Sequence, residues 1–385
     1  MTARLKTDWK LFAPLMLILA IGLTMVFSAS SVIAEVHYRK PPWVFAVKQL
    51  CFALLGLALM FAFKRLDYRR INQAQWVLGL VGVVAILLLG VLFADPVAHR
   101  WYRLGGMQLQ PSELAKPAMV LFLAWFVSRR EAERQDINDR HTIAPAALVV
   151  GVLAVLIGIG DLGTAVILLS PAAAVFFVAG IERRYFYLTL ALAVAMGIGF
   201  LAQKPYRILR LMAYAGVTEE QIQKTPSMHW LAASIAESSA TRDAGYQPKQ
   251  ARIAVATGGL AGVGLGQSNQ KLGFLPEGHT DFIFGVYAEE TGLAGSLVLL
   301  GAYLLVFWRG LSAFFRTHDR FGRYLALGAV SLITAQALFN ISVVTGVAPT
   351  KGIPLPLVSY GGSSLICTLI LCGLLLSVSD RAAEA

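Results

Sequence analysis

The stretch LFAPLMLILAIGLTMVFSASSVIA, residues 11–34, decides the fold because it contains no charged side chain. The hydrocarbon core of a membrane is about 30 Å thick and needs roughly 20 apolar residues per helix. These 24 residues are therefore long enough to cross it. The basic residues Arg4, Lys6 and Lys10 resemble the start of a secretory signal, but the apolar part that follows is too long for one. We expect an uncleaved first membrane helix.

The composition of the 385-residue chain agrees with a lipid environment. Hydrophobic residues make up 57% and charged residues 14%, against roughly 25% charged in an average soluble domain. The 33 basic and 22 acidic side chains are too few to cover a soluble multidomain enzyme of this length. The net charge of +11 does not indicate nucleic acid, because the basic residues lie between apolar stretches. Anionic lipid head groups or an anionic lipid-linked substrate fit better.

Apolar runs, seven of them without a charged residue, recur along the chain and predict an all-α polytopic membrane protein with about ten transmembrane helices, forming one domain over residues 1–385. Short segments on one side hold 18 of the 33 Lys and Arg residues, those on the other side hold 7, and the long segment 204–282 holds 8. Since short cytoplasmic loops retain basic residues, both termini are predicted to be cytoplasmic. The runs cover residues 11–34, 43–63, 71–94, 112–128, 143–160, 162–181, 185–203, 282–308, 324–346 and 363–379.

The long segment 204–282 is predicted to be a large extracytoplasmic loop between the seventh and eighth helices. It contains an amphipathic stretch, 229–238, and a charge-free run, 253–270, with five glycines. That run is too rich in Gly, Ser, Asn and Gln for a span, so a surface-lying or re-entrant segment is expected. It lacks the Lys-Ser/Thr of a phosphate-binding loop, which argues against nucleotide binding.

Ionisable residues near the outer ends of the runs are candidates for chemistry, because charge is costly to bury in a membrane. Asp281 comes just before the apolar residues 282–287 of the eighth run. One interpretation is an N-cap, whose carboxylate accepts backbone N–H groups at the start of the helix. The other is a general base whose pKa is raised by partial burial and lowered by the nearby Lys116. The sequence does not decide between them.

A second candidate lies in QPSELAK, where Glu113 and Lys116 are three residues apart. On a helix that starts at Pro111 they share a face and can pair. Alternatively, Lys116 neutralises a diphosphate that Glu113 helps to hold. Asp161, in GDLGTA, is expected to cap a helix at an outer turn.

The segment 349–364, PTKGIPLPLVSYGGSS, predicts a rigid outer turn entering the tenth run, because it combines three prolines with two adjacent glycines. Its hydroxyl groups are candidates for contacts to sugar or phosphate; they belong to Ser359, Tyr360, Ser363 and Ser364.

Four more polar residues each allow two interpretations. Glu277 and His279 either belong to a surface loop or touch substrate, whereas Glu289 and Glu290 either pair with cations from other helices or include one protonated carboxyl. No His or Cys grouping has the spacing of metal ligands, so no metal site is predicted. A loosely bound divalent cation, Mg or Mn, that bridges carboxylates and a diphosphate remains compatible with the sequence.

Five ordered motifs, which span nearly the whole chain, resemble the SEDS family (shape, elongation, division and sporulation proteins). They are FSAS, QPSELAK, DLGTA, GVGLGQSNQKLGFLPEGHTDFIFGVYAEETG and NISVVTGVAPTKGIPLPLVSYGGSSL. The sequences VVTG and PTKGIPLP resemble the division-type FtsW branch more than the elongation-type RodA branch. Leu357 departs from this pattern, since the division branch usually has an aromatic residue there, and residues 248–257 also differ from the usual stretch.

The resemblance implies ten transmembrane helices and glycosyl transfer on lipid II at the outer face of the cytoplasmic (inner) membrane. It assigns Asp281 as the catalytic residue and places Glu113 and Lys116 in the same cavity. On this basis we expect Lys116, with Arg100 or Arg103, to offset charge on the leaving diphosphate. Lipid II and undecaprenyl-diphosphate-linked glycan are the implied substrates. A class B penicillin-binding protein (transpeptidase) and other division or elongation membrane proteins are the implied partners.

Two alternative functions remain open at this point. A lipid II flippase would also need a lipid-sized cavity between helices, but it predicts functional polar residues through the whole membrane depth. A non-catalytic division scaffold predicts that a substitution of Asp281 leaves polymer synthesis unchanged. The clustering of the candidate residues toward the outer boundary favours the glycosyltransferase.

Overall fold

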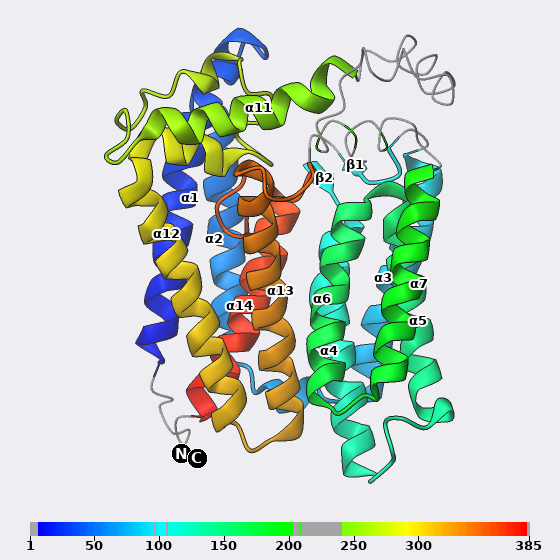
Figure 1. Cartoon of the computed structure of the whole chain (residues 1–385). Helices are drawn as coiled ribbons and strands as arrows, with labels where there is room; N and C mark the ends of the chain where they lie inside the picture. Colours follow the sequence, from blue (N-terminus) through cyan, green and yellow to red (C-terminus); the bar gives the residue numbers. More distant parts are fainter. Residues whose placement is uncertain are drawn as a thin grey trace.

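Helices dominate the computed structural model of the chain, which describes residues 7–95, 98–104, 107–202, 208, 212, 214 and 241–382 (Figure 1). Each of the ten apolar runs coincides with a helix in these residues. By length and composition seven of them can cross a membrane: α1 (Trp9–Val36), α2 (Val44–Arg65), α3 (Ala74–Ala94), α5 (Arg140–Gly160), α12 (Ile283–Arg316), α13 (Arg320–Val344) and α14 (Gly362–Ala382).

Three further helices coincide with the remaining runs: α4 (Pro111–Ala132), α6 (Leu162–Val178) and α7 (Arg183–Ala202). Helix α6 is apolar but only 17 residues long, and α4 carries five charged residues of its own near its ends. The polytopic all-α fold is thus confirmed, while the number of helices that cross the membrane stays a prediction. Outside the long helices lie the 3-10 turns η1 (Tyr68–Ile71) and η3 (Gln270–Leu272), and the strands β1 (Tyr102–Leu104) and β2 (Met107–Leu109), which pair antiparallel.

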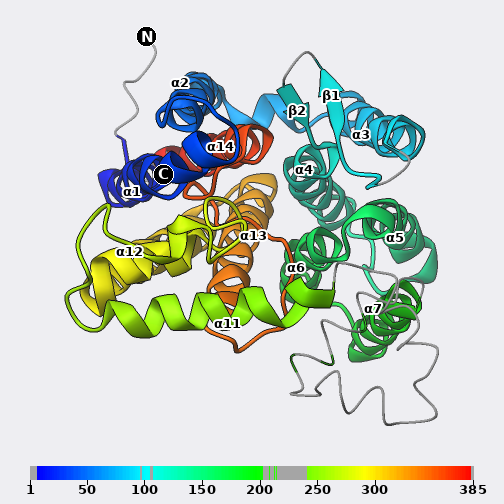
Figure 2. The same ribbon diagram turned by 90° about the horizontal axis from the view of Figure 1, so that it is seen from above.

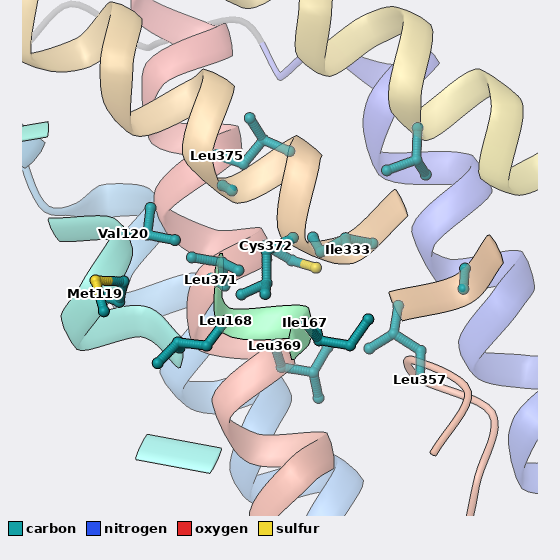
Figure 3. Packing of buried hydrophobic residues seen from close by; sticks show 14 of the residues in the cluster. Met119, Val120, Ile167, Leu168, Ile333, Leu357, Leu369, Leu371, Cys372 and Leu375 are labelled. Atoms are coloured by element: carbon teal, nitrogen blue, oxygen red, sulfur yellow. The ribbon is translucent and has the colours of Figure 1, made fainter. Parts of the chain in front are cut away.

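The long helices form two groups that stand side by side. One contains α1, α2, α12, α13 and α14 and the other α3 to α7, as Figures 1 and 2 show from two directions. Helix α13 joins the groups by packing against α4 and α6. Figure 3 shows the apolar contact region, where Met119 of α4, Leu168 of α6, Ile333 of α13 and Cys372 of α14 converge.

Both ends of the described chain lie at the same end of the bundle. The backbone N–H of Asp8 donates to a carboxylate oxygen of Asp380 at 2.8 Å, and Arg309 of α12 pairs with Asp8 at 2.7 Å. Lys64, at the end of α2, pairs with Asp380 at 3.3 Å. Four helix ends are therefore held together here, and the two termini lie on the same side of any membrane that the helices cross.

At the opposite end, helix α11 (Thr241–Gly258) lies across the tops of the other helices (Figure 1). It packs against α12. The sequence predicted a surface-lying or re-entrant segment over residues 253–270, and the structure confirms the first form for residues 253–258. The stretch 229–238, predicted to be amphipathic, lies outside the described residues.

Helix α12 is interrupted at Gly292, whose φ of 67° and ψ of −163° are not helical. The break leaves backbone groups of α12 without partners inside the helix. Residues 259–264, which follow α11, supply these partners. Val263 and Gly264 donate to the carbonyls of Glu289 and Glu290 at 3.0 and 3.1 Å. In return, the carbonyls of residues 259 and 260 accept from the backbone N–H groups of residues 293 and 294 at 2.9 and 3.1 Å.

The carboxylates of Glu289 and Glu290 are buried beside this break. Glu290 accepts from Ser28 of α1 at 2.6 Å and pairs with Lys271 of η3 at 3.3 Å. Glu289 accepts from the hydroxyl of Ser268 and from two backbone N–H groups at 3.3 Å. The predicted pairing with a cation is confirmed for Glu290, although that cation comes from the short 3-10 turn η3 rather than from a long helix.

The α12 break generates a stability prediction. A Cβ at residue 292 would lie 2.4 Å from the backbone N of Gly262 and would require a strained positive φ. We expect Gly292→Ala to lower the free energy of unfolding by about 2 kcal/mol or more, seen as a lower thermal unfolding midpoint. Gly301→Ala in the same helix is the control, since a Cβ there meets nothing within 4 Å. Equal midpoints for the two variants would contradict the account.

Candidate functional site

Asp281 lies at the α11 end of the bundle, in the segment that leads into α12. Helix α12 begins at Ile283, and no side chain caps it, so of the two interpretations of Asp281 the N-cap is wrong. The chain enters the helix through a turn instead, in which the N–H of Phe282 donates to the carbonyl of Glu277 at 3.2 Å. The half-buried Asp281 carboxylate faces the neighbouring loop 349–361.

Gly352 of this loop provides the space for that carboxylate. A Cβ at residue 352 would lie only 2.7 Å from Oδ2 of Asp281. The carbonyl oxygen of Asp281 accepts a hydrogen bond of 2.7 Å from Asn340 of α13. Asp281 is therefore fixed on one side by the loop and on the other by α13.

The loop 349–361 lies beside Asp281, and much of it is buried. Its side chains Ile353, Leu355, Leu357 and Val358 are at most 3% exposed. Gly22 of α1 allows the close approach, because a Cβ there would lie 2.3 Å from the carbonyl oxygen of Leu357. Its prolines restrict the backbone, and the helices around the segment set its depth.

The predicted hydroxyl groups of this loop take different positions. Ser359 is buried, and its hydroxyl donates to the carbonyl of Thr280 at 2.6 Å while accepting from the N–H of Leu355 at 2.8 Å. That hydroxyl therefore joins two loops. Tyr360, Ser363 and Ser364 are half-buried, so they keep some surface for a ligand.

His279 and Tyr360 form an aromatic group with Phe45 of α2. Ring centroids are 5.3 to 5.8 Å apart, and the N–H of Tyr360 donates to the carbonyl of His279 at 3.0 Å. Burial lowers the pKa of His279, and the charge of the neighbouring Glu277 opposes this shift. Glu277 itself is exposed and accepts from the hydroxyl of Thr280 at 2.7 Å.

Glu113 and Lys116 form the predicted pair on α4, which begins at Pro111 as expected. The ammonium of Lys116 lies 2.7 and 2.8 Å from the two carboxylate oxygens of Glu113 and 3.0 Å from Oε1 of Gln336 on α13. Glu113 is 1% and Lys116 4% exposed. The pair lies inside the bundle, where its charges are satisfied by protein groups.

Arg100 and Arg103 lie near the start of the β1–β2 hairpin. The guanidinium of Arg100 pairs with Asp161 at 2.5 Å, and 30% of its side chain is exposed. Asp161 also caps α6, as predicted, by accepting from the N–H and the hydroxyl of Thr164 at 3.2 and 2.8 Å. Arg103 is exposed on β1.

These helices and motifs match one family along nearly the entire chain. The model of the cell cycle proteins FtsW, RodA and SpoVE matches residues 8–384. The chain belongs to this family. The resemblance to the SEDS proteins drawn from the sequence motifs is thereby confirmed.

Relatives named as members of the FtsW/RodA/SpoVE family also match nearly the whole chain. A protein of Geobacter metallireducens named probable peptidoglycan glycosyltransferase FtsW is 36% identical over 94% of this chain and 91% of its own. Stage V sporulation protein E of Bacillus subtilis is 34% identical over 98% of both chains.

Solved structures show the same fold. RodA of Thermus thermophilus, in a variant with one aspartate replaced by alanine, matches with a TM-score of 0.68 and 27% identity over 99% of this chain and all of its own. A structure described as the coordination of polymerization and crosslinking by a peptidoglycan synthase complex gives a TM-score of 0.71 at 25% identity, with the same coverage.

Two amide side chains of the site around Asp281, Gln336 and Asn340, were not among the residues predicted from the sequence. Both are 2% exposed on α13, and both donate to carbonyls of the loop 349–361. They are uncharged, so a search for ionisable residues passes over them. Their spacing of four residues inside an apolar run is the signal that could have found them, because it places both amides on one helix face.

A resident metal ion is not supported by the side chains alone. In the described parts of the chain, no three His, Cys, Asp or Glu side chains gather closely enough to hold one. A divalent cation at this site would need oxygen ligands from a bound diphosphate.

The burial of His279 generates a pH prediction. Its lowered pKa means that folding favours the neutral ring, so this contribution to stability is complete above the unfolded pKa of about 6.5 and is lost as the pH falls toward the folded value. We expect the unfolding midpoint of the wild type to fall more on acidification than that of His279→Phe, which keeps an aromatic ring. The exposed His141→Phe should behave like the wild type. Parallel curves for the wild type and His279→Phe would contradict the prediction.

Proposed function

We propose that this chain is a peptidoglycan glycosyltransferase that joins lipid II into β-1,4 glycan strands at the outer face of the cytoplasmic membrane, during septal wall synthesis. The observation that carries the proposal is the fixed position of the Asp281 carboxylate against Gly352 at one end of a membrane bundle. Relatives named probable peptidoglycan glycosyltransferase FtsW, 36 to 37% identical over 94 to 97% of the chain, support the activity and the division role.

The orientation follows from the basic residues. Lys64, Arg309 and Arg381 lie at the end of the bundle that holds the termini, which we therefore propose to be cytoplasmic. The opposite end, with α11 and Asp281, then faces outward. Lipid II displayed at the outer leaflet would place its sugars at this end and its polyprenyl chain along the apolar helices.

In the proposed reaction, the Asp281 carboxylate takes the proton from the C4 hydroxyl of the N-acetylglucosamine of an incoming lipid II. The oxygen freed of that proton forms a bond to the anomeric carbon at the end of the growing chain. The bond from that carbon to the phosphate oxygen breaks, and undecaprenyl diphosphate leaves with the electron pair. Attack opposite the leaving group inverts the anomeric carbon and gives the β-1,4 linkage.

The surface around Asp281 suggests roles for other residues. Tyr360, Ser363 and Ser364 keep exposed surface, as do His279 and Glu277. They are proposed to bind the sugar and peptide groups. A charged diphosphate requires accessible cations, and the partly exposed Arg100 and Arg103 meet this requirement.

The partners and cofactor predicted from the sequence remain proposals. A class B penicillin-binding protein would crosslink the glycan made here, and the match to a peptidoglycan synthase complex supports such a partnership. A loosely bound Mg or Mn ion would act only with the diphosphate as a co-ligand.

The proposed base is tested by Asp281→Asn, which keeps the size of the side chain and removes its ability to take a proton. We expect polymerisation of lipid II by the purified full-length protein to fall by about a hundredfold or more, with an unchanged unfolding midpoint. Asp136→Asn is the control, because Asp136 lies on an exposed turn at the end of the bundle that holds the two termini. Polymerisation at the wild-type rate by a folded Asp281→Asn protein would contradict the assignment of Asp281 as the general base.

The same preparations also separate the two rival functions. A flippase would move lipid II between leaflets of reconstituted vesicles at a rate that does not depend on Asp281. A scaffold would show no polymerisation in any variant while still binding division proteins.

The position of the carboxylate is tested at Gly352. A Cβ at this residue would push the Asp281 carboxylate from its place, so we expect Gly352→Ala to lower kcat by at least about tenfold. Gly361→Ala in the same loop is the matched control, because a Cβ there meets its nearest neighbour at an ordinary 3.7 Å. Equal rates for the two variants would contradict the proposed geometry.

A further inference from the structure

The loop 349–361 needs hydrogen-bond donors from the rest of the protein. It is buried without helical or strand structure, so its backbone carbonyls need donors from other parts of the protein. Side chains supply three of these donors: Asn340 donates to the carbonyl of Ile353 at 2.7 Å, Gln336 to that of Pro354 at 2.8 Å, and Tyr303 to that of Pro356 at 2.5 Å. The position of the loop therefore depends on these three donors.

Asn340 joins the loop to the proposed base. Its Nδ2 group donates both to the carbonyl of Ile353 and to the carbonyl of Asp281, each at 2.7 Å. One amide group thus sets the separation of the two backbone segments. The Asp281 carboxylate then meets Gly352, the residue just before Ile353.

Gln336 joins the same loop to the buried ion pair. An ammonium group can only donate, so the amide of Gln336 must turn its oxygen to Lys116 and its Nε2 group to the carbonyl of Pro354. The reversed amide would place an NH₂ group against the ammonium and two oxygens against each other. Lys116 therefore fixes the orientation in which Gln336 can hold the loop, and Glu113 fixes Lys116.

Lys116 has little access to a substrate. Besides these contacts it borders a cavity of about 10 Å³, which Gln336, Pro356, Cys367 and Thr368 also line. Such a cavity has room for about one water molecule. A diphosphate does not fit there, and the ammonium is only 4% exposed.

We propose that Gln336 is a positioning residue through which the Glu113–Lys116 pair holds the loop 349–361, and with it Asp281, in the geometry for glycosyl transfer. The pair then acts without touching the diphosphate, in place of the direct contact expected from the sequence. This inference rests on the proposed function, because it assigns the pair to the reaction at Asp281.

The first test compares Gln336→Met with Thr368→Val. Met has nearly the length of Gln but no donor for Pro354, whereas Thr368 lines the same cavity without a part in holding the loop. We expect Gln336→Met to lower kcat for lipid II polymerisation about tenfold to a hundredfold with KM changed less than about threefold, and Thr368→Val to match the wild type. A rise in KM at constant kcat, or wild-type kinetics, would overturn the proposal.

A second variant covers the case in which Gln336→Met does not fold. Gln336→Glu keeps the size and polarity of the side chain, and the carboxyl it introduces faces Lys116 and Glu113. This carboxyl can donate to the carbonyl of Pro354 only when protonated. Its activity relative to wild type should therefore decrease as the pH is raised through its pKa, and a ratio independent of pH would overturn the proposal.

A double-mutant cycle decides whether Lys116 acts through Gln336. The combined change Glu113→Gln with Lys116→Met removes both charges and leaves neither one buried alone. If the pair acts through Gln336, adding Gln336→Met should reduce kcat by no more than about twofold further. If Lys116 contacts the diphosphate, the two losses multiply and KM rises, which overturns the proposal.

Asp281→Asn, measured in parallel, tests the proposed base separately from the coupling between the ion pair and Gln336. Full activity of that variant would refute the proposed base. The cycle between the ion pair and Gln336 would still report whether they are coupled.

Discussion

The structure depends on one constraint: a backbone segment without regular structure lies inside a membrane bundle, and its polar groups must be satisfied there. The loop 349–361 meets the constraint with side-chain donors from α12 and α13, and through Gln49 of α2, which donates to the carbonyl of Ser359 at 3.1 Å. Helices that are distant in sequence thereby converge on a single loop. The position of Asp281 follows from that convergence.

The same constraint explains the other irregular feature of the fold. The break in α12 at Gly292 exposes backbone groups, and residues 259–264 satisfy them with four hydrogen bonds. The buried ion pair of Lys271 and Glu290, with Ser28 of α1, holds the following loop against the break. The segment between α11 and α12 is thus built into the helix bundle, and it leads directly into the residues around Asp281.

Much of the fold could be predicted from the sequence because the lipid imposes a simple rule on helix length and polarity. Local spacing also gave the Glu113–Lys116 pair and the Asp161 cap correctly. The errors concern contacts between distant segments. The spacing of Asp281 before an apolar run left an N-cap as one interpretation, but its place is set by Asn340, 59 residues away. Gln336 went unnoticed for a related reason, since its importance comes from its neighbours rather than from its own charge.

Asp281 is proposed to meet the reacting sugar while Lys116 remains bound to protein groups. An experimental structure of the full-length protein with lipid II bound would test both statements at once. We expect the acceptor hydroxyl within hydrogen-bonding distance of the Asp281 carboxylate, with Lys116 still on Glu113 and Gln336. A diphosphate bound to the Lys116 ammonium, or a reacting sugar far from Asp281, would contradict this expectation.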